Sequence, residues 1–361
     1  MPSLATSATR AVAVIAAALL ATTSAAPAAD ATPTSPERAA AVAGAQVTQK
    51  VGSKAERYLG RSASVHPWYS GAWTGGHMSG TRAKRWGTWR GSISDVALTY
   101  PERGTWKQIS GSTWHIDTFG NFRGVLMYGM PLLPADGSSS LADVAAGKHD
   151  AVFRKVARDL AKRNRGRSIV RIGWEGNGDW YPWSATASNA ADYRRAFARA
   201  STVMKKAAPG LVIDFDINCG SPLRGQSNRL DSLTKLYPGD RYVDLIGCDV
   251  YDWHTTGATN AQQWQRALRP ENSPGLADVA DFARKRGKGM SVPEWGLAKP
   301  AAGGHGDNPF YIRSMRSFFT KNADVLVVEG YFNEHADYIR NSLWSEAPQN
   351  PRSAQVYRSL W

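Results

Sequence analysis

The sequence lacks the signatures of several large protein classes. It has only two cysteines, Cys219 and Cys248, in 361 residues, so it is not a small disulfide-rich fold. The seven histidines show no zinc-binding spacing, and we expect neither a metal ion nor a cofactor. No Gly-x-Ser-x-Gly nucleophile elbow and no phosphate-binding loop occurs, which argues against an α/β-hydrolase and against an NTPase.

Long runs of one charge are also missing, although basic residues predominate. The 44 Lys and Arg exceed the 30 Asp and Glu, which gives a formal net charge of +14. The basic residues are scattered in short clusters, and no nucleic-acid-binding motif accompanies them. We interpret the excess as a solvated basic surface and expect no nucleic-acid partner.

The only long apolar run lies at the N-terminus. Arg10 is followed by an apolar segment from Ala11 to Ala21, which is too short to span a bilayer stably. This pattern predicts a secretory signal peptide over residues 1–28, with an uncleaved anchor as the alternative. The protein is therefore expected to be secreted and to make no membrane contact after cleavage. In an oxidising compartment the two cysteines are candidates for a disulfide, and two buried free thiols are the alternative.

The rest of the chain divides into an arm and one large domain. Residues 29–61 are rich in Ala, Thr, Ser and Pro, which predicts a flexible arm. Residues 62–361 are long enough for a single domain with a large core, and we expect this domain to be monomeric. Fourteen Trp and thirteen Tyr indicate either a large core or flat rings that bind a ligand.

Short apolar runs alternate with amphipathic stretches beyond residue 85. The runs predict eight strands, at residues 87–90, 113–116, 124–130, 168–174, 211–218, 242–250, 289–295 and 325–331. The amphipathic stretches predict helices at residues 150–164, 190–208, 273–286 and 308–322. Nearly continuous apolar strands are typical of a parallel sheet covered by helices. The pattern therefore predicts an α/β protein with the (β/α)8 TIM barrel fold. A doubly wound open sheet is the competitor, but its usual Gly-rich phosphate loop is missing.

Two glutamates stand at the ends of predicted strands. Glu175 follows the fourth strand and Glu294 terminates the seventh, and each is flanked by Trp. Strands four and seven lie on opposite sides of an eight-stranded ring, so the two carboxylates are expected to face each other across its mouth. A retaining glycosidase uses two carboxylates about 5–5.5 Å apart, one as nucleophile and the other as acid/base. For either glutamate alone, a capping or salt-bridged carboxylate is the alternative.

A longer motif begins at Glu175 and reads Glu-x-Asn-Gly-x-Trp-Tyr-x-Trp, and Pro-Glu-Trp-Gly surrounds Glu294. This pattern resembles glycoside hydrolase family 26, which is best known for β-mannanases and belongs to a clan of retaining barrel enzymes. The resemblance implies that Glu175 is the acid/base, that Glu294 is the nucleophile and that Tyr251 donates a hydrogen bond to Glu294. One position departs from the family. Its mannanases usually have His before the acid/base, and Trp174 in this chain weakens the assignment of mannan without affecting the chemistry.

Seven residues near these strand ends are candidates for binding substrate: Arg171, Asn177, Trp180, Trp183, Asn218, Tyr251 and Trp295. The three tryptophans offer flat rings on which sugars can stack, although core packing is the alternative for any single Trp. The asparagines offer amides to sugar hydroxyls, and an Asn-Gly turn is the alternative for the first. The arginine points inward on the fourth strand and either holds a carboxylate ionised or forms a structural ion pair.

Together these patterns predict a secreted retaining endo-β-glycanase, β-mannanase-like, that hydrolyses a polysaccharide by double displacement. The same chemistry on β-xylan, β-glucan or a bacterial surface polysaccharide is the first alternative. The second is a non-catalytic carbohydrate-binding barrel. The presence of both glutamates argues against this last reading, because a lectin needs neither.

Overall fold

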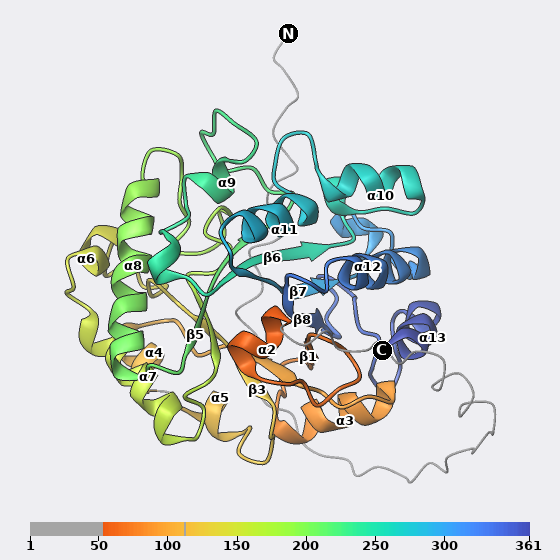
Figure 1. Cartoon of the computed structure of the whole chain (residues 1–361), viewed down its shortest axis with the longest axis horizontal. Helices are drawn as coiled ribbons and strands as arrows, with labels where there is room; N and C mark the ends of the chain where they lie inside the picture. The colour runs from red at the N-terminus through yellow and green to blue at the C-terminus, as the bar shows by residue number, and fades with distance from the viewer. Residues whose placement is uncertain (1–52, 112) are drawn as a thin grey trace.

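Eight parallel strands form a closed barrel in the computed structural model, which describes residues 53–111 and 113–361 (Figure 1). Neighbouring strands follow one another in chain order, and β1 pairs with β8 to close the ring. The strands are β1 (Tyr69–Trp73), β2 (Val96–Thr99), β3 (Val125–Met130), β4 (Ile169–Ile172), β5 (Val212–Asn218), β6 (Leu245–Tyr251), β7 (Gly289–Gly296) and β8 (Leu326–Phe332). Nearly all their residues are buried, because side chains point alternately into the barrel and against the helices. The predicted TIM barrel is confirmed.

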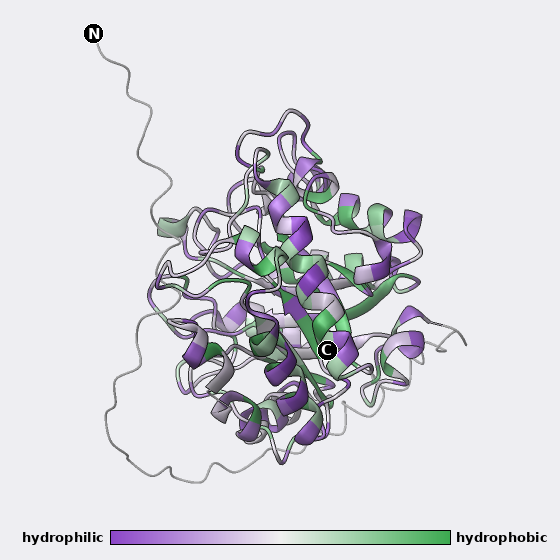
Figure 2. Cartoon of the chain, turned by 90° about the vertical axis from the view of Figure 1, so that its left-hand side faces the viewer, coloured by the Kyte–Doolittle hydropathy of each residue, from purple (hydrophilic) through white to green (hydrophobic). Residues whose placement is uncertain are grey.

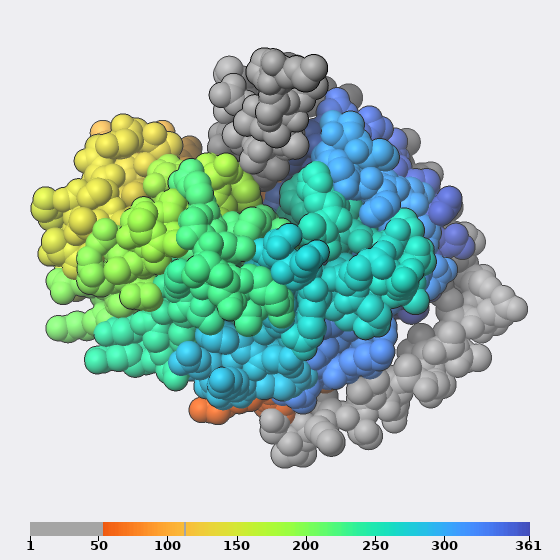
Figure 3. All heavy atoms as spheres, turned by 90° about the horizontal axis from the view of Figure 1, so that it is seen from above, coloured from red at the N-terminus to blue at the C-terminus, as the bar shows by residue number. Residues whose placement is uncertain are grey.

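Helices surround the barrel and turn their apolar sides toward it (Figure 2). In α7, Phe153 and Leu160 are buried two turns apart on one side of the helix. Seen from above, green segments that include α8 and teal to blue segments that include α10 to α12 form neighbouring parts of the outer surface (Figure 3). The helices are α2 (Lys54–Leu59), α3 (Gly80–Arg90), α4 (Trp106–Gly111), α5 (Trp114–Asp117), α6 (Leu141–Ala145), α7 (Asp150–Lys162), α8 (Ala190–Ala207), α9 (Asp231–Thr234), α10 (Ala261–Leu268), α11 (Leu276–Lys285), α12 (Pro309–Lys321) and α13 (Pro351–Leu360), with short 3₁₀ turns at Asp240–Tyr242, His254–Thr256 and Pro300–Ala302. The four predicted helices correspond to α7, α8, α11 and α12.

Two of the eight predicted strands are wrong, and two observed strands were not predicted. Residues 87–90 belong to α3, and residues 114–116 belong to α5, with Thr113 at its N-cap. In α3 the buried residues Trp86 and Arg90 are one helical turn apart. The predicted segment of four residues, 87–90, is too short to reveal this helical spacing. The strands that were missed, β1 and β2, are short. β1 is interrupted by Gly71, where a Cβ atom would collide with a carbonyl oxygen of β2, so close strand pairing requires glycine there.

The packed domain begins before the predicted boundary at residue 62. α2 lies across the end of the barrel at which the strands begin, with Leu59 buried and the Lys54 ammonium donating to the Gly287 carbonyl at 2.8 Å. The predicted signal peptide, residues 1–28, and most of the predicted arm lie outside the described residues. Within residues 53–111 and 113–361, no helix combines the length and hydrophobicity needed to cross a bilayer.

The two cysteines are joined. Cys219 directly follows β5 and is disulfide-bonded to Cys248 in β6, with their Cα atoms 5.6 Å apart. Because β5 and β6 are paired neighbours, the bond ties together two strands whose ends reach the mouth of the barrel. The predicted disulfide is confirmed.

Candidate active site

Both candidate catalytic glutamates lie at the end of the barrel where the strands finish. Glu175 is three residues past the end of β4, and Glu294 lies two residues before the end of β7. The two residues are 5% and 6% exposed, respectively, so both carboxylates are withdrawn from bulk water. TIM-barrel enzymes build their active sites at this end.

The backbone turns sharply before Glu175. Gly173 and Glu175 both have φ near 52°, in the left-handed backbone region that residues other than glycine rarely adopt. At Gly173 a Cβ would lie only 2.5 Å from the Leu132 side chain, so glycine is needed there for space as well. The Glu175 amide donates to Asp216 Oδ1 at 3.3 Å, which helps to hold the strained turn. Such strain is found where a side chain must be presented in one fixed position.

Glu294 is fixed by donors on both of its oxygens. Its Oε1 accepts hydrogen bonds from Arg171 Nη1 at 2.7 Å and from the Tyr100 hydroxyl at 2.5 Å. Its Oε2 accepts a bond from the Tyr251 hydroxyl at 2.8 Å, so the hydrogen bond predicted for Tyr251 is present. The carboxylate is therefore held in a single orientation, as attack on one carbon atom requires.

Arg171 links the two glutamates through a pair of aspartates. Its guanidinium, which is fully buried, forms ion pairs with Asp216 at 2.5 Å, with Asp249 and with Glu294. Asp249 also accepts the backbone amide of Glu294 at 3.0 Å, as Asp216 accepts that of Glu175. Each aspartate thus accepts a hydrogen bond from the backbone of one candidate catalytic glutamate and pairs with one side of the same guanidinium. Arg171 has no surface left for substrate, so the prediction that it binds substrate is wrong, and it positions the carboxylates instead.

Glu175 has the protonation behaviour of a general acid. Burial raises the pKa of its carboxyl to about 8, and the nearby charge of Glu294 acts in the same direction. Hydrogen bonds from Asn218 Nδ2 at 2.6 Å and Trp180 Nε1 at 2.9 Å oppose this rise, because both donors favour the charged form. At neutral pH Glu175 therefore holds a proton that it can give to a leaving oxygen.

Removing either of these hydrogen-bond donors should shift the pH profile of kcat/KM to higher pH. In Asn218→Ala the ionised form of Glu175 loses a hydrogen bond, so its pKa rises above about 8 and the alkaline limb of kcat/KM shifts to higher pH. Trp180→Phe removes the other donor and should shift the limb in the same direction. The measurement is the rate against pH for both variants and the parent. A shift to lower pH in either variant contradicts this account of Glu175.

The predicted substrate-binding residues separate into exposed and buried groups. Trp180 is half-buried beside Glu175, so part of its side chain remains accessible to a sugar. Asn177 is different. Its side-chain Nδ2 donates hydrogen bonds to the backbone carbonyls of Asn218 and Ser221, both at 2.9 Å, and its Oδ1 accepts one from the backbone N–H of Asn218 at 2.8 Å. Its hydrogen-bonding capacity is used within the protein, so it positions Asn218 instead of binding sugar.

Two predicted stacking platforms lie in the core. Trp183 is fully buried, donates to the Trp174 carbonyl at 2.8 Å and stacks on Tyr181. Trp295 is also fully buried and donates to Glu329 Oε2 at 2.6 Å. The prediction that these two rings bind sugar is wrong. Trp295 immediately follows Glu294, and because successive strand residues point to opposite faces, its ring lies on the helix side of β7.

The sequence analysis did not find Tyr100, which follows β2 directly. Its hydroxyl bonds Glu294 and also accepts from Arg171 Nη1 at 2.7 Å, and its ring contacts Trp73 and Trp174 at centroid distances of 5.3 and 5.4 Å. Trp174, which replaces the family's histidine, is 1% exposed and packs behind Tyr100. A second tyrosine therefore holds the predicted nucleophile, and Trp174 supports it.

Tyr100→Phe is expected to lower kcat about 10-fold, because it removes one hydrogen bond to a charged carboxylate and leaves two. The ring and its packing remain, so the melting temperature should change little. Steady-state kinetics with thermal unfolding test this. Tyr128→Phe is the matched control, since among the described residues the hydroxyl of that tyrosine bonds His115 at 3.0 Å and neither glutamate. Equal kinetic effects from the two substitutions would refute the role of Tyr100.

Comparison with known proteins identifies the family of this chain. The model of glycosyl hydrolase family 26 matches residues 90–288, more than half of the chain. The chain belongs to this family. Glu175 lies inside the matched segment, whereas Glu294 lies just beyond its end, so the assignment of Glu294 depends on the hydrogen bonds described above.

Two curated relatives of this family 26 chain match only in part. Endoglucanase H of Acetivibrio thermocellus is 32% identical over 157 residues, which cover 39% of this chain and 16% of the relative. A mannan endo-1,4-beta-mannosidase of Bifidobacterium adolescentis is 27% identical over 179 residues, which cover 46% of this chain and 17% of the relative. The aligned part is thus about a sixth of each relative.

Solved structures share the fold of the family 26 chain at low sequence identity. A Cellulomonas fimi endo-beta-1,4-mannanase double mutant superposes with a TM-score of 0.56 at 15% identity, covering 80% of this chain and 68% of that one. The catalytic domain of a Bacillus sp. JAMB-750 endo-beta-1,4-mannanase gives a TM-score of 0.53 at 17% identity, covering 82% of this chain and 81% of that one.

Among the described residues, no cluster of His, Cys, Asp and Glu is arranged to hold a metal ion.

Proposed function

We propose that this family 26 protein is a retaining endo-β-glycanase that cleaves a β-linked polysaccharide by double displacement. The observation that carries the proposal is the contrast between its two carboxyl groups. Glu175 is a buried acid with a pKa of about 8, while Glu294 accepts three hydrogen bonds, one of them from a guanidinium. Groups with such different surroundings suit the two roles that the reaction requires.

In the first step Glu294 attacks the anomeric carbon while Glu175 gives its proton to the departing glycosidic oxygen. The bond to the leaving sugar breaks, and a covalent glycosyl ester forms on Glu294. In the second step Glu175, now ionised, takes a proton from water, and the oxygen of that water attacks the same carbon and releases Glu294. Two inversions give net retention. The ionised Glu175 is then stabilised by its bonds from Asn218 and Trp180.

The substrate that we propose first is a β-mannan, because a mannosidase and two mannanase structures are among the similar proteins. A β-glucan is the second candidate, supported by the similarity to an endoglucanase and by Trp174 in place of the mannanase histidine. The N-terminal signal motif supports secretion, which would place the enzyme where polysaccharides occur.

A panel of galactomannan, mixed-linkage β-glucan, xylan and crystalline cellulose tests the proposal. We expect new reducing ends from one soluble glycan, with oligosaccharides as early products, and proton NMR of the first product should show the β-anomer before mutarotation. An α-anomer formed first would refute the retaining mechanism. Tight binding of a glycan without turnover by the folded protein would instead support a non-catalytic carbohydrate-binding barrel.

A further inference from the structure

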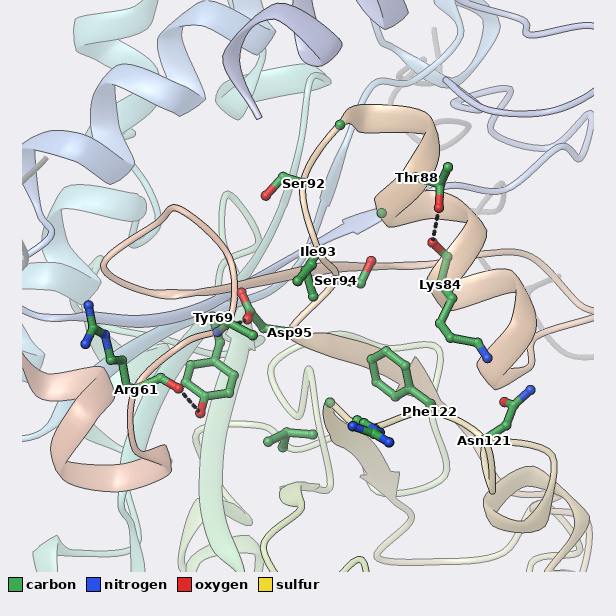
Figure 4. Close-up of a pocket in the computed structure, with 16 residues that line it drawn as sticks. Arg61, Tyr69, Lys84, Thr88, Ser92, Ile93, Ser94, Asp95, Asn121 and Phe122 are labelled. Atoms are coloured by element: carbon green, nitrogen blue, oxygen red, sulfur yellow. Dashed lines mark hydrogen bonds between the residues drawn. The ribbon is translucent and has the colours of Figure 1, made fainter. Parts of the chain in front are cut away.

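A large cavity opens at the opposite end of the barrel from the glutamates. It has a volume of about 920 Å³ and lies between α3 and the segments that enter β1, β2 and β3 (Figure 4). Its lining includes Tyr69, Asp95 and Val125, which stand at or just before the starts of their strands. Small-molecule and oligosaccharide sites are typically clefts of about 300–1,000 Å³, so the cavity is large enough for several sugar rings.

Three cations from separate segments line this cavity, against a single carboxylate, that of Asp95. Arg61 precedes β1, Lys84 lies on α3 and Arg123 precedes β3, and all three side chains are exposed. In Figure 4, Arg61 and Lys84 stand on opposite sides of the cavity, with Asp95 between them. Within the described residues none of the three side chains forms a hydrogen bond or an ion pair. Their charges are therefore available to a ligand.

The one carboxylate in the lining is already occupied. Asp95 accepts the amides of Ala63 at 2.7 Å and Ser64 at 2.9 Å on one oxygen, and that of Ser70 at 3.2 Å on the other. Because these three backbone donors face its oxygens, Asp95 forms no ion pair with the cations around it. A concave site with uncompensated charge of one sign concentrates ligands of the opposite charge.

Two hydroxyl groups in the same lining also lack partners. The Oγ atoms of Ser92 and Ser94 are inaccessible to solvent and form no hydrogen bond in the described part of the chain, and Ser94 is 5% exposed. A second cavity of about 460 Å³ shares Tyr69 and Arg123 with the first and adds the exposed Arg167. The cationic lining thus continues across the start of the barrel.

We propose that this pair of cavities is a non-catalytic binding groove for an acidic polysaccharide, whose anionic groups bind Arg61, Lys84 and Arg123. Arginine matches carboxylates and phosphates with a planar fork of donors. Single-stranded nucleic acid is the competing polyanion, but its sites also need exposed rings for base stacking. The aromatic residues in this lining, Tyr69 and Phe122, are only 7% and 4% exposed, so they offer no such surface.

Calorimetric titration of the full protein with hexagalacturonate, phosphorylated dextran, cellohexaose and a short single-stranded DNA tests this proposal. We expect one or both acidic glycans to bind at low salt, with an affinity that weakens as the salt concentration rises, whereas any binding of neutral cellohexaose should depend neither on salt nor on the three cations. The two acidic probes distinguish carboxylate from phosphate. In R61Q/K84Q/R123Q the affinity should fall about 30-fold, or about threefold for each exposed cation removed.

The matched control is R158Q/R313Q/K321Q, which removes the same charge from three exposed side chains that line neither cavity. It should retain the parent affinity within about twofold, as expected for surface charges far from the ligand. Equal losses in both triple variants, no binding of either acidic glycan, or tighter binding of DNA through the same cations would each overturn the proposal. Binding is measured here and not hydrolysis, so failure of this proposal is distinguishable from failure of the proposed function.

Discussion

Glu294→Ala is expected to reduce hydrolysis at least about 10⁴-fold, the order of loss seen when the attacking group of a covalent mechanism is removed. Without the carboxylate no glycosyl ester can form, and the donors from Arg171, Tyr100 and Tyr251 point into an empty space. The fold should persist, because those donors lie at the mouth of the barrel where water can replace the lost oxygens. Single-turnover kinetics on the best substrate and thermal unfolding measure both effects.

Azide distinguishes the two carboxyl groups from each other. In Glu294→Ala, azide can enter the vacated space and displace the leaving group in one inversion, which gives the α-glycosyl azide from a β-glycoside. In Glu175→Ala, azide attacks the ester on Glu294 and gives the β-azide. That variant should lose about 10²–10⁴-fold on polysaccharide, yet much less on aryl glycosides, whose leaving group needs no proton. The same azide anomer from both variants would refute the assignment.

The positions of the two glutamates could be predicted from sequence because one follows and the other ends a predominantly apolar run. β4 and β7 gave clear signals, and strand ends at the mouth of a barrel bring together residues distant in sequence. The predicted number of the strand before Glu175 was correct because two errors cancelled. Two predicted strands, at residues 87–90 and 113–116, were in fact helical, while β1 and β2 were missed, so β4 remained the fourth strand.

The surroundings of the glutamates were harder to predict, because they depend on which side of a strand each residue faces. Tyr100 could not be found without β2, a four-residue strand with a weak pattern. The missed signal was a tyrosine directly after Val-Ala-Leu-Thr, a short buried run. Trp183 and Trp295 are close to the glutamates in sequence, but their rings pack in the core. Aromatic residues near a catalytic motif are as often its support as its binding surface, and sequence alone does not separate the two.

The buried ion-pair network predicts a large effect on stability. In Arg171→Met, Asp216 and Asp249 lose the cation that joins them, and the free energy of unfolding at pH 7 should fall by about 3–5 kcal/mol. Activity in the remaining folded protein should also be lost, because Glu294 loses one of its three donors and both aspartates lose the group that holds them. Chemical denaturation followed by fluorescence of the many tryptophans measures the first effect.

The loss should depend on pH in a definite direction. Burial already raises the pKa of Asp249 well above its ordinary value and also raises that of Asp216, while the charge of Arg171 opposes both shifts. Without Arg171 both pKa values rise further, so the folded state holds more protons than the unfolded state, and stability falls as pH rises above the ordinary aspartate range. Arg171→Met should therefore be less destabilised at pH 5 than at pH 7.

Arg163→Met is the matched control for this prediction. It removes an exposed ion pair with Asp117, in which the two side chains are 2.5 Å apart, and should cost less than about 1 kcal/mol, equally at pH 5 and at pH 7. There the arginine lowers the pKa of a carboxyl that is otherwise ordinary, so the stabilisation is fully present above the ordinary aspartate pKa and is lost only as pH falls toward the folded value. Arg171→Lys retains a charge but not the planar fork, and it should recover part of the stability without restoring kcat. A loss in Arg171→Met that is the same at both pH values would mean that removal of the arginine does not raise the pKa values of the two aspartates.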